Sequence, residues 1–371
     1  MNFNNIIGQK NIKKFLIKII KNNKIPPSIF FLGSSGYGPL LMALTFSKYL
    51  LCDNNDINCK IRVDNFHHPD LYFTFPVFKN KKLNRSFFLK KWISFLKENP
   101  YGDLYDWLKI LNAENKNLQI GVEEIENIID NISLKSFEGK YKIIILWMPE
   151  KLNIQASNKI LKTLENPPEK TMIFLIGEKE KNILPTILSR TQIIRFKKNS
   201  SKEIKEALIK KFSFTKKKIN NIVYLCDGNF NTALKLCFSK IEDKKNNFYF
   251  LIWMKSIFFS KKYKEVLCNF IKLSEKINKW GKERQKKFLI FSLFFFRKIL
   301  EKKYSPGENY IFYLYKYDKI FLKYFNKNIT WNKIKKINMA INFSIDCINK
   351  NANFKILFFD LSIKISKYYY S

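Results

Sequence analysis

Five short apolar runs, each of strand length and separated by segments long enough for helices, constrain the fold of the first 196 residues more than any other feature. Several of these runs are apolar on both faces, as strands must be when helices cover both sides of a sheet. The runs are 28–32 (SIFFL), 70–75, 142–146 (KIIIL), 172–176 (MIFLI) and 192–196 (QIIRF). This alternation predicts a parallel α/β sheet.

One intervening helix is expected over 157–165. Ile160, Leu161 and Leu164 fall on one stripe of that helix, which is the pattern of a helix that packs one face on a core. Two prolines follow at 167–168 and cannot continue it. The helix is therefore predicted to stop sharply before them.

After Phe196 the pattern becomes helical, with no convincing strand. The chain has 371 residues, which is room for two or three domains when one domain takes about 150 residues. We therefore expect an α/β domain over 1–198, a small helical domain over 199–240 and a longer all-α domain over 241–371.

Charge is the most unusual property of the composition. The chain has 68 Lys and Arg against 31 Asp and Glu, a formal net charge of +37, while 46% of its residues are hydrophobic. The apolar content excludes intrinsic disorder as the main state. The charge has two interpretations: a nucleic-acid partner, or an AT-rich genome whose codons favour Lys, Asn, Ile, Phe and Tyr. Charge alone does not decide between them.

The six cysteines lie far apart, at positions 52, 59, 226, 237, 268 and 347. In a long chain whose residues 1–10 hold no apolar leader segment, this spacing predicts reduced thiols and a cytoplasmic location. The most apolar run, 288–296, is much shorter than the ~18–20 residues of a membrane helix. We therefore expect a soluble protein.

A glycine-rich segment directly follows the first predicted strand. Gly33 and Gly38 match the glycines of the phosphate-binding pattern GxxxxGK[ST], and Gly36 lies between them. Pro39 stands where the pattern has Lys, and Leu40 where it has Ser or Thr. Lys neutralises the β and γ phosphates and the hydroxyl binds magnesium, so this segment is expected to be a degenerate remnant that binds no cofactor.

The strand predicted at 142–146 leads into a second departure. An ATPase needs an Asp for magnesium and usually a Glu to activate water after this strand, but Trp147 and Met148 occupy those positions. Two departures in the correct order, each at a strand end, indicate a P-loop ancestry without its catalytic groups.

Several motifs together resemble the AAA+ core of bacterial replicative clamp loaders. They are Phe3 with 6–9 (IIGQ), 23–26 (NKIP), the SIFFLG strand, 156–171 and 183–190 (ILPTILSR), all within roughly the first 200 residues. The chain looks most like the delta-prime subunits of DNA polymerase III, which, unlike the gamma/tau motor, tolerate a broken ATP site. The resemblance implies that 199–240 is a lid, 241–371 a collar for assembly, and about 79–117 an insertion.

The resemblance also implies a role for the segment 189–191, Ser-Arg-Thr, which differs from the family's Ser-Arg-Cys motif at its last position. Arg190, with Ser189, would be an arginine finger that reaches into the ATP site of a neighbouring subunit. A planar guanidinium suits a γ-phosphate. The competing interpretation is that Arg190 pairs with a local carboxylate.

The chain also departs from the family at the positions of its zinc-binding cysteines and of its nucleotide-sensing Arg. Many members carry four cysteines that bind zinc, whereas only Cys52 and Cys59 remain here, followed by His67 and His68. Because a structural zinc site needs four ligands at suitable spacing, we expect this remnant to hold no metal. Asn231 stands where motor subunits keep a nucleotide-sensing Arg.

The resemblance predicts a clamp-loader subunit that helps to load the sliding clamp onto primed DNA and hydrolyses no ATP itself. Its expected partners are gamma/tau and delta subunits and, through the complex, the clamp and DNA, with no membrane. One alternative is a gamma/tau-like ATPase with a divergent P-loop. The other is a basic DNA-binding AAA+ relative outside replication.

Overall fold

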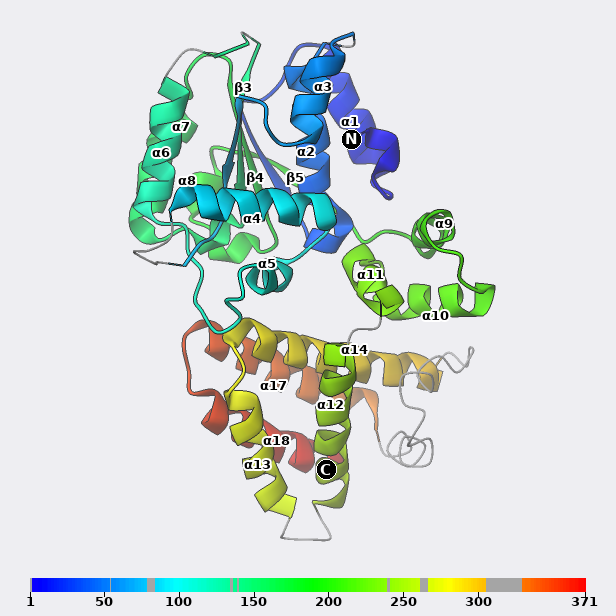
Figure 1. Cartoon of the computed structure of the whole chain (residues 1–371). Coiled ribbons are helices and arrows are strands. Elements are labelled where there is room, and N and C mark those ends of the chain that lie inside the picture. Colours follow the sequence, from blue (N-terminus) through cyan, green and yellow to red (C-terminus); the bar gives the residue numbers. More distant parts are fainter. Residues whose placement is uncertain are drawn as a thin grey trace. The chain divides into compact units, whose positions relative to one another are not determined.

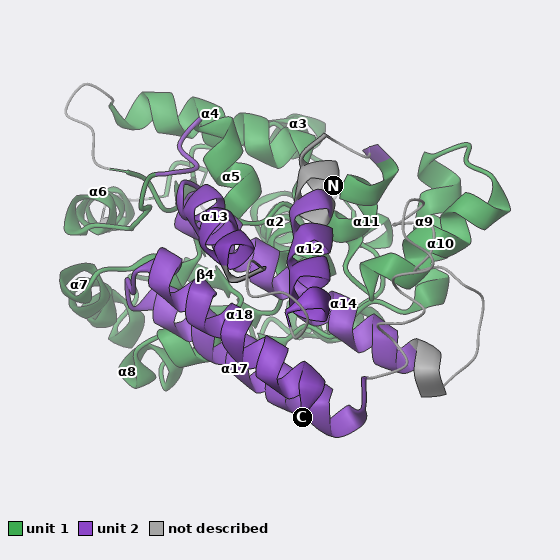
Figure 2. Cartoon of the chain, turned by 90° about the horizontal axis from the view of Figure 1, so that it is seen from below, with its two compact units in different colours: residues 1–111, 116–237 green, residues 112–115, 238–371 purple. Residues whose placement is uncertain are grey.

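The computed structural model describes residues 2–53, 55–78, 84–133, 136–138, 140–238, 241–260, 266–304 and 329–371. The chain forms two compact units (Figure 2). The first contains residues 1–111 and 116–237, and the second contains residues 112–115 and 238–371. The division into three domains at 198 and 240 stays a prediction.

A five-stranded parallel sheet is the centre of the first unit (Figure 1). The strand order is β2-β3-β4-β1-β5, and Phe30 of β1 lies opposite Leu175 on one side and Ile193 on the other. The predicted strands and the parallel α/β class are confirmed. The strands are β1 (Ser28–Leu32), β2 (Leu71–Thr74), β3 (Lys142–Trp147), β4 (Thr171–Gly177) and β5 (Gln192–Arg195).

Helices cover both faces of this sheet, which explains why its central strands are apolar throughout. On one face, helices α6 (Val122–Ser133) and α7 (Ile154–Glu165) pack on a core that includes Phe30 and Ile144. On the other face lies α2 (Pro39–Leu51), whose Phe46 packs against Phe174 with ring centroids 5.3 Å apart. The remaining helices of the α/β part are α1 (Lys10–Lys21), α3 (Ile57–Asp64) and the short α8 (Pro185–Leu188).

Helix α7 ends where the prolines predicted, but it begins at Ile154, three residues before the predicted start. Asn153 precedes it, and its side-chain oxygen accepts a hydrogen bond from the backbone N–H of Ala156 at 2.7 Å. This capping bond stabilises the first turn. The apolar stripe alone did not reveal that turn.

The expected insertion at about 79–117 contains two helices, α4 (Arg85–Glu98) and α5 (Leu104–Ile110); residues 79–83 lie outside the described part. Trp92, Phe95 and Trp107 are fully buried between these helices and the sheet. The Trp92 ring centroid lies 5.4 Å from that of Trp107 and 5.2 Å from that of Phe95. Aromatic packing therefore joins α4 and α5 to each other and to the sheet.

Three helices complete the first unit: α9 (Ser201–Lys211), α10 (Lys216–Cys226) and α11 (Phe230–Phe238). Ser200 and Glu203 form a reciprocal capping box at the start of α9. Ile204 of α9, Ile222 of α10 and Phe230 of α11 share one buried cluster. We call these three helices the lid helices.

The second unit consists of helices in its described residues, as the sequence predicted. Its core is strongly aromatic: Trp253 packs against Phe358 with ring centroids 4.8 Å apart and donates a hydrogen bond to Ser362. The helices are α12 (Ile241–Phe259), α13 (Val266–Asn278), α14 (Lys282–Tyr304), α17 (Trp331–Asn349) and α18 (Phe354–Tyr370). None of the helices in the described part of the chain combines the length and apolar character that a membrane crossing requires.

The expectation that all cysteines are reduced thiols is wrong for one pair. Cys52 and Cys59 form a disulfide, with their Cα atoms 5.6 Å apart. Cys52 directly follows α2, and Cys59 lies in the first turn of α3, so the short connection between the helices brings the two side chains together. That Cα separation is in the range that a disulfide requires.

Candidate functional site

The segment 33–38 connects β1 to α2, as a phosphate loop does. Gly38 has φ +91°, a left-handed conformation that favours glycine, and directly precedes the first residue of α2. Pro39 begins that helix, which is the structural role that its fixed φ suits. Leu40 is buried in the core, with 1% of its surface exposed. Neither position presents a cation or a hydroxyl to the loop.

A carboxylate of the chain itself accepts hydrogen bonds from one residue of this loop, Ser35. Oε1 of Glu178, the residue after β4, accepts hydrogen bonds from the backbone N–H of Ser35 at 2.8 Å and from its hydroxyl at 2.7 Å. Ser35 is buried, whereas Glu178 lies at the exposed rim. An anionic oxygen on a loop N–H is the arrangement by which such loops bind phosphate.

Asparagines near the lid helices cover the same loop. Asn229 donates a hydrogen bond from Nδ2 to the Ser34 hydroxyl at 3.1 Å, and its Oδ1 lies only 1.9 Å from where a Cβ on Gly36 would be. Asn199 donates from Nδ2 to the carbonyl oxygen of Gly36 at 3.4 Å. Gly36 is therefore required for this close approach, and the loop has little free space on that side.

The end of β3 carries no carboxylate at the two positions where an ATPase needs them. Trp147 is buried against Trp92 and Phe95 of α4, with ring centroids 5.0 and 5.5 Å away. Met148 is also buried and adopts a left-handed conformation with φ 59°. Helix α4 thus packs on the residue that stands at the position of the expected Asp.

Glu150 lies two residues beyond Met148 and was not predicted as a site residue. Its Oε1 accepts a hydrogen bond from the backbone N–H of Glu178 at 2.8 Å. Its Oε2 is buried and has no hydrogen-bond partner among the described residues. Burial raises the pKa of Glu150 from its ordinary 4.5 to about 7. The protonated form of this carboxyl group therefore persists to a higher pH than in an ordinary glutamate.

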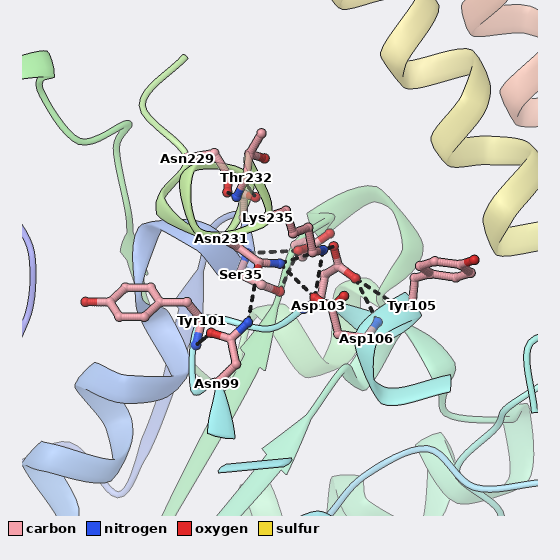
Figure 3. Close-up of polar contacts among 12 residues, drawn as sticks. Ser35, Asn99, Tyr101, Asp103, Tyr105, Asp106, Asn229, Asn231, Thr232 and Lys235 are labelled. Atoms are coloured by element: carbon pink, nitrogen blue, oxygen red, sulfur yellow. Dashed lines mark hydrogen bonds and ion pairs between the residues drawn. The ribbon is translucent and has the colours of Figure 1, made fainter. Parts of the chain in front are cut away.

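A second polar cluster joins the insertion to the lid helices (Figure 3). Asn231, which stands where the resemblance implies a nucleotide-sensing Arg in motor subunits, is buried and makes hydrogen bonds to Asn99, Asp103 and Asp106. Lys235, one turn further along α11, forms ion pairs with Asp103 and Asp106. The replacement at 231 is therefore part of a built network.

Arg190 makes a local ion pair, as the competing interpretation of this residue supposed. Its Nη2 lies 2.5 Å from Oε1 of Glu165, the last residue of α7, and its Nη1 donates to the Thr186 carbonyl oxygen at 2.9 Å. The Ser189 hydroxyl lies 3.3 Å from the same Nη1. About a third of the Arg190 side chain, 34%, is exposed.

The zinc remnant contains a possible ligand group. Cys59, His68 and Glu138 bring one sulfur, one nitrogen and one oxygen within 4.8 Å of one another. The sulfur of Cys59 is bonded to Cys52, however, and His68 Nε2 lies 3.0 Å from Glu138 Oε2. His68 Nδ1 accepts from the backbone N–H of Asp70 at 3.1 Å, which assigns the ring proton to Nε2. His67 is exposed and outside this group.

Residues 8–200 match the family model described as "DNA polymerase III, delta subunit". The chain is 26% identical over 208 residues to "DNA polymerase III subunit delta'" of Bacillus subtilis, which covers 54% of this chain and 51% of that protein. It is 28% identical over 242 residues to "DNA polymerase III subunit gamma/tau" of Mycoplasma genitalium, which covers 64% of this chain and 35% of that protein. The chain therefore spans between about a third and a half of the length of these relatives.

Among solved structures, the chain is similar to a "gamma subunit-related protein" of DNA polymerase III from Thermotoga maritima. That similarity has a TM-score of 0.36 and 17% identity, and it covers 95% of this chain and 99% of the other. The family match at 8–200 extends over just over half of the 371 residues and confirms the resemblance noted from the motifs. The chain therefore belongs to the DNA polymerase III delta subunit family of clamp-loader proteins.

Proposed function

We propose that this chain is a clamp-loader subunit of DNA polymerase III that hydrolyses no ATP itself and supplies Arg190 to a neighbouring subunit. One observation carries the proposal: the buried N–H of Ser35 in the phosphate loop is already bonded to the chain's own carboxylate, Glu178. A nucleotide phosphate would have to displace that carboxylate. Family membership supplies the setting for this role.

The side chains around the loop also support the absence of ATP hydrolysis. Pro39 and Leu40 offer nothing to neutralise phosphate or to bind magnesium, and Trp147 and Met148 offer no carboxylate for the metal or for water. These last two side chains are also buried, and Trp147 packs against the rings of Trp92 and Phe95 of α4. The gamma/tau-like ATPase alternative would need all four groups to come from elsewhere.

Arg190 has properties that suit action on another subunit. Its pair with Glu165 is partly exposed on both sides, and exposed pairs contribute only about 0–1 kcal/mol. A γ-phosphate with more negative charge can therefore compete with Glu165 for the guanidinium fork. Arginine fingers raise phosphoryl-transfer rates by about 10³- to 10⁵-fold, which would make a chain without hydrolysis necessary to its complex.

The proposed partners are other clamp-loader subunits, gamma/tau and delta, and through them the sliding clamp and primed DNA in the cytoplasm. The α-helical second unit, residues 238–371, is the proposed collar for this assembly, with the lid helices as a small domain before it. In this proposal the positive charge of the chain lies on solvated faces, some of which are near the DNA that the complex binds.

Isothermal calorimetry of the isolated chain with MgATP tests the first half of the proposal. We expect no heat of tight binding and no phosphate release. Micromolar, magnesium-dependent binding would overturn the non-hydrolysing role and favour the ATPase alternative. Co-purification with gamma/tau and delta subunits tests the setting, since a basic AAA+ protein outside replication would not assemble with them.

Arg190→Ala in the reconstituted complex tests the second half. The variant should assemble normally, but DNA- and clamp-stimulated ATP turnover at the adjacent site should fall by about 10³-fold or more. Arg190→Lys should restore little, because an ammonium does not reproduce the guanidinium fork.

The matched control is Arg195→Ala. Arg195 is also an exposed arginine paired with one carboxylate, Glu180, at 2.8 Å, and it lies on β5 a few residues further along. This variant should keep full turnover. Full turnover in Arg190→Ala with normal assembly would remove the arginine-finger role.

A further inference from the structure

Residues 99–106 comprise the connection between α4 and α5 and the first turn of α5, and Figure 3 shows them facing lid helix α11. We call this stretch the latch segment. Asn99 donates to Asn231 Oδ1 at 2.8 Å, and the Asn231 amide donates to Asp106 at 2.8 Å and to Asp103 at 3.3 Å. The buried amide of Asn231 therefore uses both its oxygen and its nitrogen on the latch segment.

A charged pair of contacts lies beside this amide. Lys235 Nζ is 2.9 Å from Asp103 Oδ2 and 2.8 Å from Asp106 Oδ2. The side chains of the two aspartates are only 25% and 17% exposed. Burial by itself lowers the pKa of Lys235, but the two aspartates outweigh burial and raise it, so the ammonium stays charged. Separating α11 from the latch segment would remove Lys235 from two neighbouring, largely buried carboxylates, which is costly.

The same segment reaches the phosphate loop through Tyr101. Its hydroxyl oxygen accepts a hydrogen bond from the backbone N–H of Ile7 at 3.1 Å, and its ring packs edge-on against Phe230 of α11 at 5.0 Å. Its Cε1 lies 3.0 Å from where a Cβ on Gly38 would be. Tyr101 is 6% exposed and burial raises its pKa to about 12. It therefore bridges the chain's N-terminal part, the loop and the lid.

The other end of the insertion is fixed as well. Trp92 and Phe95 of α4 pack against Trp147 at the end of β3, and Gly102 of the latch segment lies so close to Phe95 that a Cβ there would be 2.5 Å from its ring. The latch segment is thus anchored on the sheet at one side and bonded to α11 at the other. It has little freedom to follow a lid that moves.

We propose that the latch segment holds the lid helices closed against the phosphate loop whether or not a nucleotide is present. In this chain the contacts that close the lid come from Asn99, Asp103 and Asp106 of the insertion. A bound ligand is not required to make them. The inference rests on contacts inside the first unit and stands independently of any action of Arg190 on a neighbour.

Amide hydrogen exchange of the full chain tests this directly. Backbone amides of α10 and α11 should be protected in the wild type, with equal rates with and without millimolar MgATP. In Asn231→Asp a third carboxylate replaces the amide between Asp103 and Asp106. The amide exchange rates of α10 and α11 should therefore rise by about tenfold or more, while the exchange rates of β1 stay unchanged.

The control variant is Lys198→Met. It breaks the exposed ion pair of Lys198 with Asp227, which lies beside the lid helices but does not involve the latch segment. Its exchange in α11 should match the wild type. A rise there equal to that in Asn231→Asp would show general loosening of the lid and would overturn the role of the latch.

Asn99→Ala keeps the test decisive if Asn231→Asp unfolds, which faster exchange in β1 would reveal. It removes one hydrogen bond to Asn231 and introduces no charge, so α11 should exchange several-fold faster with β1 unchanged. Unchanged exchange in α11 of a folded variant would overturn the proposal. So would wild-type lid amides that become several-fold more protected when MgATP is added.

Discussion

The phosphate-loop region and the corner around Arg190 belong to the same α/β part but are built in opposite ways. Around the loop, Ser35, Leu40 and Trp147 are buried. The N–H of Ser35 donates to a carboxylate of the chain itself, that of Glu178. Around Arg190, one exposed ion pair with Glu165 and short-range hydrogen bonds hold a guanidinium that is one-third exposed. In the first region a carboxylate of the chain bonds the loop N–H of Ser35, whereas in the second the guanidinium lies at a partly exposed corner.

Trp92→Ala should give the largest effect and tests how far the stability of the loop region depends on the packing of α4. Trp92 is fully buried and contacts the rings of Phe75, Phe95 and Trp107 as well as Trp147. Truncating a buried Trp costs about 3–5 kcal/mol. Urea denaturation should show this loss in the free energy of unfolding. Amide hydrogen exchange in β3 should assign the loss to the first unit.

Two variants calibrate that measurement. Trp92→Phe keeps a ring and removes a buried Nε1–H that has no hydrogen-bond partner among the described residues, so it should cost far less. Phe137→Ala removes a ring that is 87% exposed and should change stability by less than about 0.5 kcal/mol. Equal losses in Trp92→Ala and Phe137→Ala would contradict the description of α4 as core.

Glu150→Gln should change how the stability of the first unit depends on pH. The pKa of Glu150 is about 7 in the folded chain against an ordinary 4.5, so the unfolded chain loses this proton first as pH rises. Stability is therefore highest below pH 4.5, falls between 4.5 and 7, and is lower by a constant amount above 7. Gln cannot ionise, so this fall should disappear.

The measurement is urea denaturation at pH 5 and pH 8. Between these values the variant should gain about 2 kcal/mol relative to the wild type. Glu169→Gln, at an exposed position before β4, is the control and should follow the wild-type pH dependence. A variant that tracks the wild type at both pH values would show that Glu150 is not buried as described.

The parallel sheet was predictable because its strands carry their signal locally. SIFFL and KIIIL are apolar on both faces, which only a sheet covered on both sides explains, and the prolines at 167–168 fixed the end of α7. The losses at Pro39, Leu40, Trp147 and Met148 were also readable, because a motif names the residue type that each position should hold.

What could not be predicted are partners that folding brings from far along the chain. Glu178 is 143 residues from Ser35 and Tyr101 is 94 from Ile7, and no spacing rule connects them. The disulfide was missed because all six cysteines were treated as far apart in a cytoplasmic chain, whereas Cys52 and Cys59 are only 7 residues apart and the short connection between α2 and α3 brings them together. A carboxylate directly after a strand, as Glu178 is after β4, was the signal available for the loop.

Glu178→Ala should have a smaller effect than Glu150→Gln and tests whether the loop is closed by its own carboxylate. The change frees the Ser35 N–H and hydroxyl, at a cost of about 1 kcal/mol because water can reach the rim. Calorimetry with MgATP should still show no tight binding, since Pro39 and Leu40 remain. The exposed neighbour variant Lys179→Ala is the control. Tight binding by Glu178→Ala would mean that Glu178 alone keeps nucleotide out.

Glu165→Gln should have the smallest effect on stability and most sharply separates the two interpretations of Arg190. Both partners of this pair are partly exposed, 34% for Arg190 and 44% for Glu165, so losing it should cost less than about 0.5 kcal/mol. If Arg190 acts on a neighbour, releasing it should leave stimulated ATP turnover in the reconstituted complex equal to or above the wild type. Glu180→Gln, which releases Arg195 in the same way, should leave turnover unchanged.

If the ion pair itself is what matters, Glu165→Gln and Arg190→Ala should impair the complex equally, because each breaks the same contact. The arginine-finger role predicts turnover at or above the wild type in Glu165→Gln and strongly reduced turnover in Arg190→Ala, although the two variants have nearly equal stabilities.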